Sequence, residues 1–179
     1  MKIYFKVCLV LAIAFALGGC YESKAPMASS EGSTLDPNLV GRWKAIVTED
    51  DTTPAEILVL KFNDNEYYVR YQEEEEVTRC RAYMVMVDGV PFINLQLIAV
   101  EELDKKGHIR FLKEDERIFF FFRYSLSKDD VLTLKMVSDD FVKTQFKSSK
   151  ELYEFIKKNL KNEKLYETFR FIKTSDDQE

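Results

Sequence analysis

Few side chains in this sequence have the type and spacing that enzyme chemistry requires. The single histidine, His108, lies in a charged segment and has no second ligand at the spacing of a zinc site. The sequence contains no Gly-rich phosphate loop, no Gly-x-Ser-x-Gly motif and no Cys-x-x-Cys pair. Asp139 and Asp140 could act as a hydrolytic carboxylate pair, but adjacent acids there are more typical of a solvated turn or cap. We therefore expect a protein that is not an enzyme and that carries no cofactor or metal.

The acidic run from Glu73 to Glu76 is a second candidate for chemistry, because clustered carboxylates can bind calcium. Like charges this close together repel one another when they are packed. The run is therefore more typical of a solvated hairpin tip than of a calcium site.

Cys20 has the clearest chemical context of the three cysteines. Lys2 and Lys6 precede an apolar run, Val7–Leu17. This run is too short to span a bilayer, because a membrane-spanning helix needs about 20 residues. A basic start followed by a short apolar run is typical of a secretion signal. The run ends in Leu17-Gly18-Gly19-Cys20, which resembles the lipobox of bacterial lipoproteins.

The resemblance implies that residues 1–19 are a lipoprotein signal peptide, cut before a Cys20 whose sulfur carries diacylglycerol. The protein would then be attached to a membrane by acyl chains, each buried CH₂ contributing about 0.8 kcal/mol. Tyr21 stands where the inner-membrane retention signal has Asp, which implies the outer membrane in a bacterium with two membranes. A plain signal peptide and a short buried helix are the alternatives.

Charge and cysteine content limit the partners. The chain carries 26 Lys and Arg against 31 Asp and Glu, a net charge of -5. Without residues 1–19, which hold two Lys and no acid, the net charge is -7, so we expect no nucleic-acid partner and no electrostatic attraction to anionic lipid. Cys80 would be the one thiol left in the fold. Arg79 and Arg81 point to the opposite strand face, so a buried structural Cys80 is favoured over a nucleophile.

The mature chain divides into three parts. Residues 20–36 are small and polar and include Pro26 and Gly32, which predicts a flexible tether. Residues 37–174 are expected to form one domain, and residues 175–179 a polar tail. Short β-type segments at regular spacing predict an antiparallel barrel or sandwich; they are residues 39–48, 57–62, 67–72, 77–87, 90–99, 108–112, 116–126 and 131–137.

Two local signals are specific. Asp88-Gly89 predicts a tight hairpin between the fourth and fifth segments. Ser148 with Glu151 matches a helix capping box, and it begins a helix over residues 148–160 whose apolar stripe includes Leu152 and Ile156. A last strand, residues 165–173, follows the helix. An even number of strands closed into a barrel would leave no edges.

Gly41-Arg42-Trp43 resembles the Gly-x-Trp motif of the lipocalin-like (calycin) group. The order of strands, one helix and a closing strand is similar to that group as well. The resemblance implies an antiparallel β-barrel of about eight strands, mainly β, with Trp43 plugging one end and a late Arg packed across it. Arg170 and Arg123 are both candidates for this Arg, and the choice stays open.

A barrel of eight strands is just wide enough to be filled by side chains or to hold one small ligand. The residues expected to line the interior are aromatic or Met: Tyr67, Tyr71, Tyr83, Met84, Met86, Phe92, Phe119, Phe121 and Met136. One hypothesis is an envelope lipoprotein that binds a small hydrophobic or amphipathic ligand in a cavity of about 300 Å³ or more. The alternative is a non-enzymatic interaction or inhibitor protein with a filled barrel, acting through its outer surface.

Overall fold

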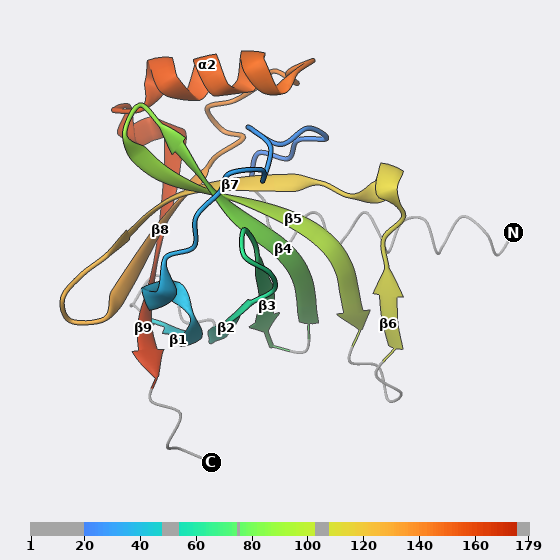
Figure 1. Ribbon diagram of the computed structural model, residues 1–179, viewed down its shortest axis with the longest axis vertical. Helices are drawn as coiled ribbons and strands as arrows, with labels where there is room; N and C mark the ends of the chain where they lie inside the picture. Colours follow the sequence, from blue (N-terminus) through green and yellow to red (C-terminus); the bar gives the residue numbers. More distant parts are fainter. Residues whose placement is uncertain (1–19, 48–53, 75, 103–107, 175–179) are drawn as a thin grey trace, which may run out of the picture.

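The computed structural model describes residues 20–47, 54–74, 76–102 and 108–174, and in this part nine antiparallel strands form one sheet (Figure 1). The sheet order is β4-β3-β2-β1-β9-β8-β7-β5-β6, and β4 also pairs with β5, so eight strands close into a barrel while β6 lies outside. The strands are β1 Gly41–Ala45, β2 Ala55–Lys61, β3 Tyr67–Glu73, β4 Glu76–Val87, β5 Val90–Glu102, β6 His108–Phe111, β7 Phe119–Leu126, β8 Val131–Val137 and β9 Tyr166–Thr174. A helix, α2 Ser149–Asn159, precedes the last strand.

The predicted fold class is confirmed: the protein is mainly β, a closed antiparallel barrel with one helix before the last strand. This arrangement is consistent with a lipocalin-like fold. The predicted signal peptide, residues 1–19, and the predicted polar tail, residues 175–179, lie outside the described residues. No helix in the described part of the chain is long and apolar enough to cross a membrane.

The two local signals are confirmed as well. Asp88 and Gly89 have φ angles of 51° and 80°, the left-handed conformations that a two-residue hairpin turn needs between β4 and β5. The Ser148 hydroxyl accepts a hydrogen bond from the Glu151 backbone N–H (3.3 Å), which caps α2. The apolar stripe of α2 then packs on the outside of the barrel.

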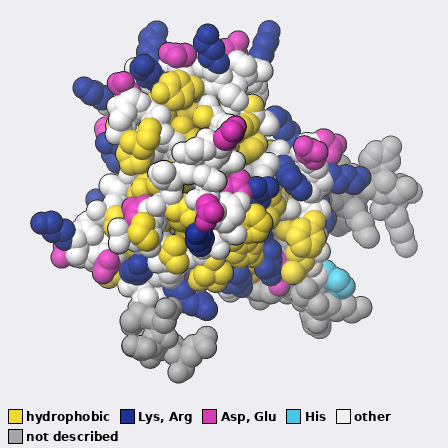
Figure 2. Space-filling view, viewed as in Figure 1, with side chains coloured by type: hydrophobic (Ala, Val, Ile, Leu, Met, Phe, Trp, Pro, Cys, Tyr) yellow, Lys and Arg dark blue, Asp and Glu magenta, His cyan; other side chains and the backbone are white. Residues whose placement is uncertain are grey.

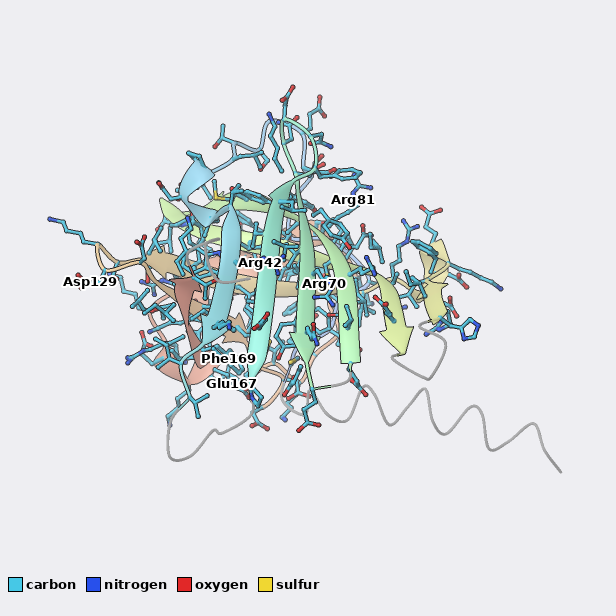
Figure 3. All side chains as sticks on the ribbon, turned by 90° about the horizontal axis from the view of Figure 1, so that it is seen from below. Arg42, Arg70, Arg81, Asp129, Glu167 and Phe169 are labelled. Carbon is cyan, nitrogen blue, oxygen red and sulfur yellow. The ribbon has the colours of Figure 1, made fainter. Side chains whose placement is uncertain are left out.

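The antiparallel barrel has two ends, which we name by a residue at each. At the Trp43 end, β1 begins and β2 ends, and the 3-10 turn Pro37–Leu39 precedes β1. At the Glu73 end, β3 and β8 end and β7 begins. In Figure 3, Arg81 lies toward the Trp43 end, and Glu167 and Phe169 lie toward the Glu73 end.

Two hydrophobic cores result. The inner core fills part of the barrel and contains Trp43 with inward-facing residues such as Ile57 and Leu134. The outer core lies between α2, the outer face of the sheet and the segment before β1 (Figure 1). Its buried members include Tyr83, Phe92, Phe119, Phe121, Leu152 and Ile156.

The segment predicted to be a flexible tether packs on the barrel instead. Tyr21 and Met27 are only 2% exposed, and both belong to the outer core. The N–H of Met27 donates to the Oδ1 of Asn94, a fully buried side chain on β5 (2.8 Å). The tether prediction is therefore wrong for these residues. The segment is polar in its overall composition, but it contains two apolar side chains, and the outer core buries both.

Candidate functional site

The barrel encloses a cavity of about 200 Å³. Its walls are the inward faces of seven of the eight barrel strands, with mainly aliphatic and aromatic side chains. They include Ile57, Val59, Val69, Ile93, Leu95, Leu97, Phe120, Phe122, Leu132, Leu134, Phe169 and Phe171. The cavity is smaller than the expected 300 Å³, so it suits a small ligand better than a bulky one.

Hydrogen-bonding groups in the cavity wall lie toward its two ends. At the Trp43 end, the Tyr67 hydroxyl accepts from the N–H of Asp36 (2.6 Å) and donates to the carbonyl of Asp36 (3.1 Å). At the Glu73 end, the Tyr71 hydroxyl donates to the Oε2 of Glu73 (2.7 Å), and Glu76 is the cross-strand partner of Glu73. The middle of the cavity is therefore apolar, and the Glu73 end is acidic.

Trp43 is buried in the inner core toward one end of the barrel. The indole is fully buried, and its Nε1–H donates to the carbonyl of Leu39 (2.9 Å). The Nζ of Lys173 lies 5.2 Å from the centroid of the indole ring, a cation–π contact. Gly41 allows the close approach of Lys173: its φ is 135°, and a Cβ on Gly41 would lie 2.9 Å from the Lys173 Cε.

The cation over Trp43 is therefore Lys173, and the prediction of Arg170 or Arg123 is wrong. Side chains alternate between the two faces of a strand. On β9, Phe169 and Phe171 line the cavity, so Lys173 continues the inward face while Arg170 is exposed on the other. Arg123 shares its face of β7 with the outer-core residue Phe121.

The structure divides the predicted lining residues into three groups. Tyr67, Tyr71 and Met136 line the cavity. Met84 packs against the inner core but is not part of the cavity wall. The prediction is wrong for the other five: Tyr83, Phe92, Phe119 and Phe121 belong to the outer core, and Met86 is 55% exposed.

The error on β7 is one of strand face. Phe119, Phe120, Phe121 and Phe122 are consecutive, so both faces of the strand are equally aromatic and the pattern does not indicate which face is inward. The pairing decides it: Phe120 lies opposite Leu95, and both line the cavity, whereas Phe121 lies opposite the outward-facing Asn94. The neighbouring strand, rather than the sequence of β7, carries this information.

Cys20 is a cavity residue that sequence reasoning placed on a tether. It forms a bridge with Ser138 just after β8, and its side chain contacts the cluster of Phe120 and Met136. It lines the cavity at the Glu73 end. Burial, assisted by the carboxylate of Glu167, raises the pKa of its thiol to about 12. Unmodified, this thiol is a neutral, weakly reactive group.

Cys80 is buried inside the barrel, and burial raises the pKa of its thiol to about 12. We expect a thiol reagent at pH 8 to modify Cys80 at least 100-fold more slowly in the folded protein than in the denatured chain. Between pH 9 and pH 12 the Cys80 thiol loses its proton in the unfolded chain and keeps it in the folded protein. The free energy of unfolding therefore falls as the pH rises through this range. Labelling a protein that starts at residue 20 and carries Cys20→Ala, with and without guanidinium, measures this rate. Equal rates would show that Cys80 is accessible in the folded state.

The other candidate residues are spread over the surface. Asp139 and Asp140 are exposed in the turn after β8, and the Asp140 N–H donates to the Ser138 hydroxyl (3.2 Å). His108 is exposed at the start of β6. Among the described residues, no three His, Cys, Asp or Glu side chains are grouped as a metal site would require.

A second hollow lies outside the barrel at the Trp43 end, a cleft of about 750 Å³ between the β7–β8 hairpin and the segment before β1. Its lining is strongly charged and includes Asp36, Arg123, Lys128, Asp130, Lys135 and Lys173. Such a lining does not suit an apolar ligand. The ligand would displace water from the charged groups, and apolar contacts would not offset the lost hydration free energy. The barrel cavity is therefore the candidate site.

Comparisons with known proteins do not assign the chain to a family. No family model matches the sequence, no curated protein matches it, and no solved structure matches it. The function is therefore inferred from the geometry of the barrel and of Cys20.

Proposed function

We propose that this protein is a lipid-anchored lipoprotein of the bacterial cell envelope whose lipocalin-like barrel binds one small hydrophobic or amphipathic ligand. In a bacterium with two membranes, the absence of Asp after Cys20 favours the outer membrane. The anchor is the acylated Cys20, and the ligand site is the barrel cavity. The proposal includes no enzymatic step.

The observation that supports ligand binding is the apolar cavity inside a closed barrel. Interiors pack closely, and voids larger than a water molecule are few in a domain. The apolar side chains around a cavity of about 200 Å³ have no atoms to pack against on the cavity side. A ligand that filled the cavity would supply these dispersion contacts. The cavity is small, so the bound part of the ligand is a small apolar group.

The polar groups in the cavity wall favour one class of amphipathic ligand. Glu73 and Glu76 lie at one end of a mainly apolar wall. A cationic or hydrogen-bond-donating head group would be attracted there, and an anionic one would be repelled. We therefore favour a ligand with a small apolar group and an amine head group over a fatty acid.

Filling the cavity tests ligand binding. We expect Val69→Phe, which adds a ring inside the barrel, to lower the binding of dodecylamine at least tenfold. Native mass spectrometry or calorimetry measures this on a protein that starts at residue 20 and carries Cys20→Ala. Val131→Phe is the matched control, because Val131 lies on β8 beside the cavity-lining Leu132 and faces outward. Equal binding by wild type and Val69→Phe, or no binding by wild type, would contradict the proposal. Lauric acid, with the same chain length, should bind more weakly than dodecylamine.

Metabolic labelling tests the anchor. In cells fed an alkyne analogue of a fatty acid, we expect the full-length protein to be labelled and to sediment with membranes. Cys20→Ala should lose both properties, because the lipidated sulfur is absent. Cys80→Ala is the matched control and should be labelled normally, since Cys80 is buried inside the barrel. Labelling that persists in Cys20→Ala would show that the acyl group is attached elsewhere.

The alternative function, an envelope interaction protein acting through its outer surface, has support from β6. This short strand lies at the end of the sheet order and pairs with β5 among the described strands. It also exposes Phe111, which is 71% exposed, and Ile109. Figure 2 shows hydrophobic side chains reaching the surface among the charged ones on this face.

A further inference from the structure

The segment that follows Cys20 is tied to the barrel by a series of backbone hydrogen bonds. The Tyr21 N–H donates to the carbonyl of Val137 (3.0 Å). The Ser23 N–H donates to the carbonyl of Phe119 (3.1 Å), and the Phe119 N–H donates to the carbonyl of Ser23 (2.8 Å). The segment therefore lies between the end of β8 and the start of β7, both of which belong to the Glu73 end. We call residues 20–27 the seat.

Burial of two side chains also holds the seat in place. The Tyr21 ring contacts Phe121 and Phe146, with ring centroids 6.3 and 6.0 Å apart. Met27 is buried in the outer core, and its N–H is bonded to Asn94. Freeing the seat would expose both apolar side chains, so we expect it to stay in place in the folded protein.

Because of the seat, no flexible linker separates an anchor at Cys20 from the barrel. A free tether of about 16 residues would span roughly 22 Å on average and let the barrel turn in any direction. With the seat in place, Cys20 itself is held against the barrel, at the Glu73 end. The position of the acyl chains then determines which end of the barrel faces the membrane.

We infer that the Glu73 end of the barrel is docked on the lipid leaflet that receives the Cys20 acyl chains, so that the cavity faces this leaflet. The inference rests on the proposed lipidation of Cys20. Because Cys20 both carries the anchor and lines the cavity, the leaflet lies next to the acidic end of the cavity. The Trp43 end then points into the aqueous compartment.

The surface of the Glu73 end is compatible with a lipid head-group layer of low negative charge. Ile46 and Val47, which follow β1 at this end, are exposed apolar residues. Glu73, Glu74 and Glu76 on the β3–β4 hairpin would be repelled by anionic head groups. Vesicles of phosphatidylcholine, which have no net charge, are therefore the appropriate probe.

Fluorescence quenching by brominated lipid tests the orientation on the full-length, processed protein reconstituted into phosphatidylcholine vesicles. Two variants place a tryptophan at opposite ends: Val47→Trp at the Glu73 end and Phe62→Trp at the Trp43 end. The native side chains are 53% and 56% exposed, so the two sites are matched. The native Trp43, the single tryptophan of the sequence, is a constant buried background. We expect brominated lipid to reduce the added emission of Val47→Trp at least twofold and to leave that of Phe62→Trp unchanged.

An insertion variant tests whether the seat sets this orientation. A 12-residue Gly-Ser insertion between Cys20 and Tyr21 keeps the acylated cysteine but places a flexible linker between it and the barrel. It should abolish the difference in quenching between Val47→Trp and Phe62→Trp. Intact mass gives the acyl content of each sample. A protein with no acyl group would overturn the proposed anchor and this inference together. An acylated, vesicle-bound protein in which both reporters are quenched equally, or neither is, would overturn the orientation alone. A difference that survives the insertion would show that the seat does not set the orientation.

Discussion

Replacing Trp43 by alanine is expected to lower the free energy of unfolding by about 3–5 kcal/mol, the usual cost of removing a large buried aromatic side chain. The indole is fully buried at one end of the barrel, where it contributes to the inner core. The change also leaves the carbonyl of Leu39 without its indole donor and Lys173 without its ring. For a domain of this size the melting temperature should fall by about 10–15 °C. Urea or thermal unfolding followed by circular dichroism measures the effect.

Two further variants separate the contributions at Trp43. Trp43→Phe keeps an aromatic ring but loses the hydrogen bond to Leu39, and it should cost less than Trp43→Ala. Lys173→Met removes the cation and keeps an apolar stem, so its cost should be about 0.5–2 kcal/mol. A loss below about 1 kcal/mol for Trp43→Ala would contradict the contribution of the buried indole to the inner core.

Replacing Tyr21 by alanine should have an effect of similar size, although Tyr21 stands in a segment whose composition predicts a tether. The side chain is 2% exposed and lies between Phe121 and Phe146 in the outer core. Its removal leaves a cavity beneath the seat, and we expect the free energy of unfolding to fall by about 3–5 kcal/mol. Limited proteolysis should also cleave residues 20–27 faster, because the seat would open more often.

The controls for Tyr21 lie on the same segment. Tyr21→Phe keeps the ring, so it should retain most of the stability that Tyr21→Ala loses. Lys24→Ala, at an exposed position of the seat, should change stability by no more than about 0.5 kcal/mol. If Tyr21→Ala were as stable as wild type, residues 20–36 would be a tether after all, and the inferred orientation on the membrane would lose its basis.

Several elements of the fold could be predicted because their signals are local. Asp88-Gly89 predicts its hairpin since few other residue pairs adopt two consecutive positive φ angles. Ser148 and Glu151 predict the start of α2 because the cap is made within one turn. Tyr67 and Tyr71 lie on one face of β3 and line the cavity, and alternation along β3 indicates their shared face without information from another strand.

The candidate site could be predicted only in part, because its remaining residues are selected by pairing. The cation over Trp43 is Lys173, which follows the inward face of β9, and nothing near Trp43 in the sequence indicates it. The inward position of Phe120 likewise depends on its pairing with Leu95. The position of Cys20 in the cavity wall depends on contacts with residues more than 90 positions away.

The sequence by itself determined the mainly β class, the hairpin of β4 and β5, the helix before the last strand and the chemical context of Cys20. These features depend on patterns within a few residues: turn conformation, helix capping, alternation and a short apolar run. Only the tertiary structure decided which aromatic faces line the cavity, which cation covers Trp43, and that residues 20–23 pair with the barrel at the Glu73 end. The physical reason is that burial depends on both of the surfaces that pack together. When a strand has apolar residues on both faces, its packing partners decide which face points into the barrel.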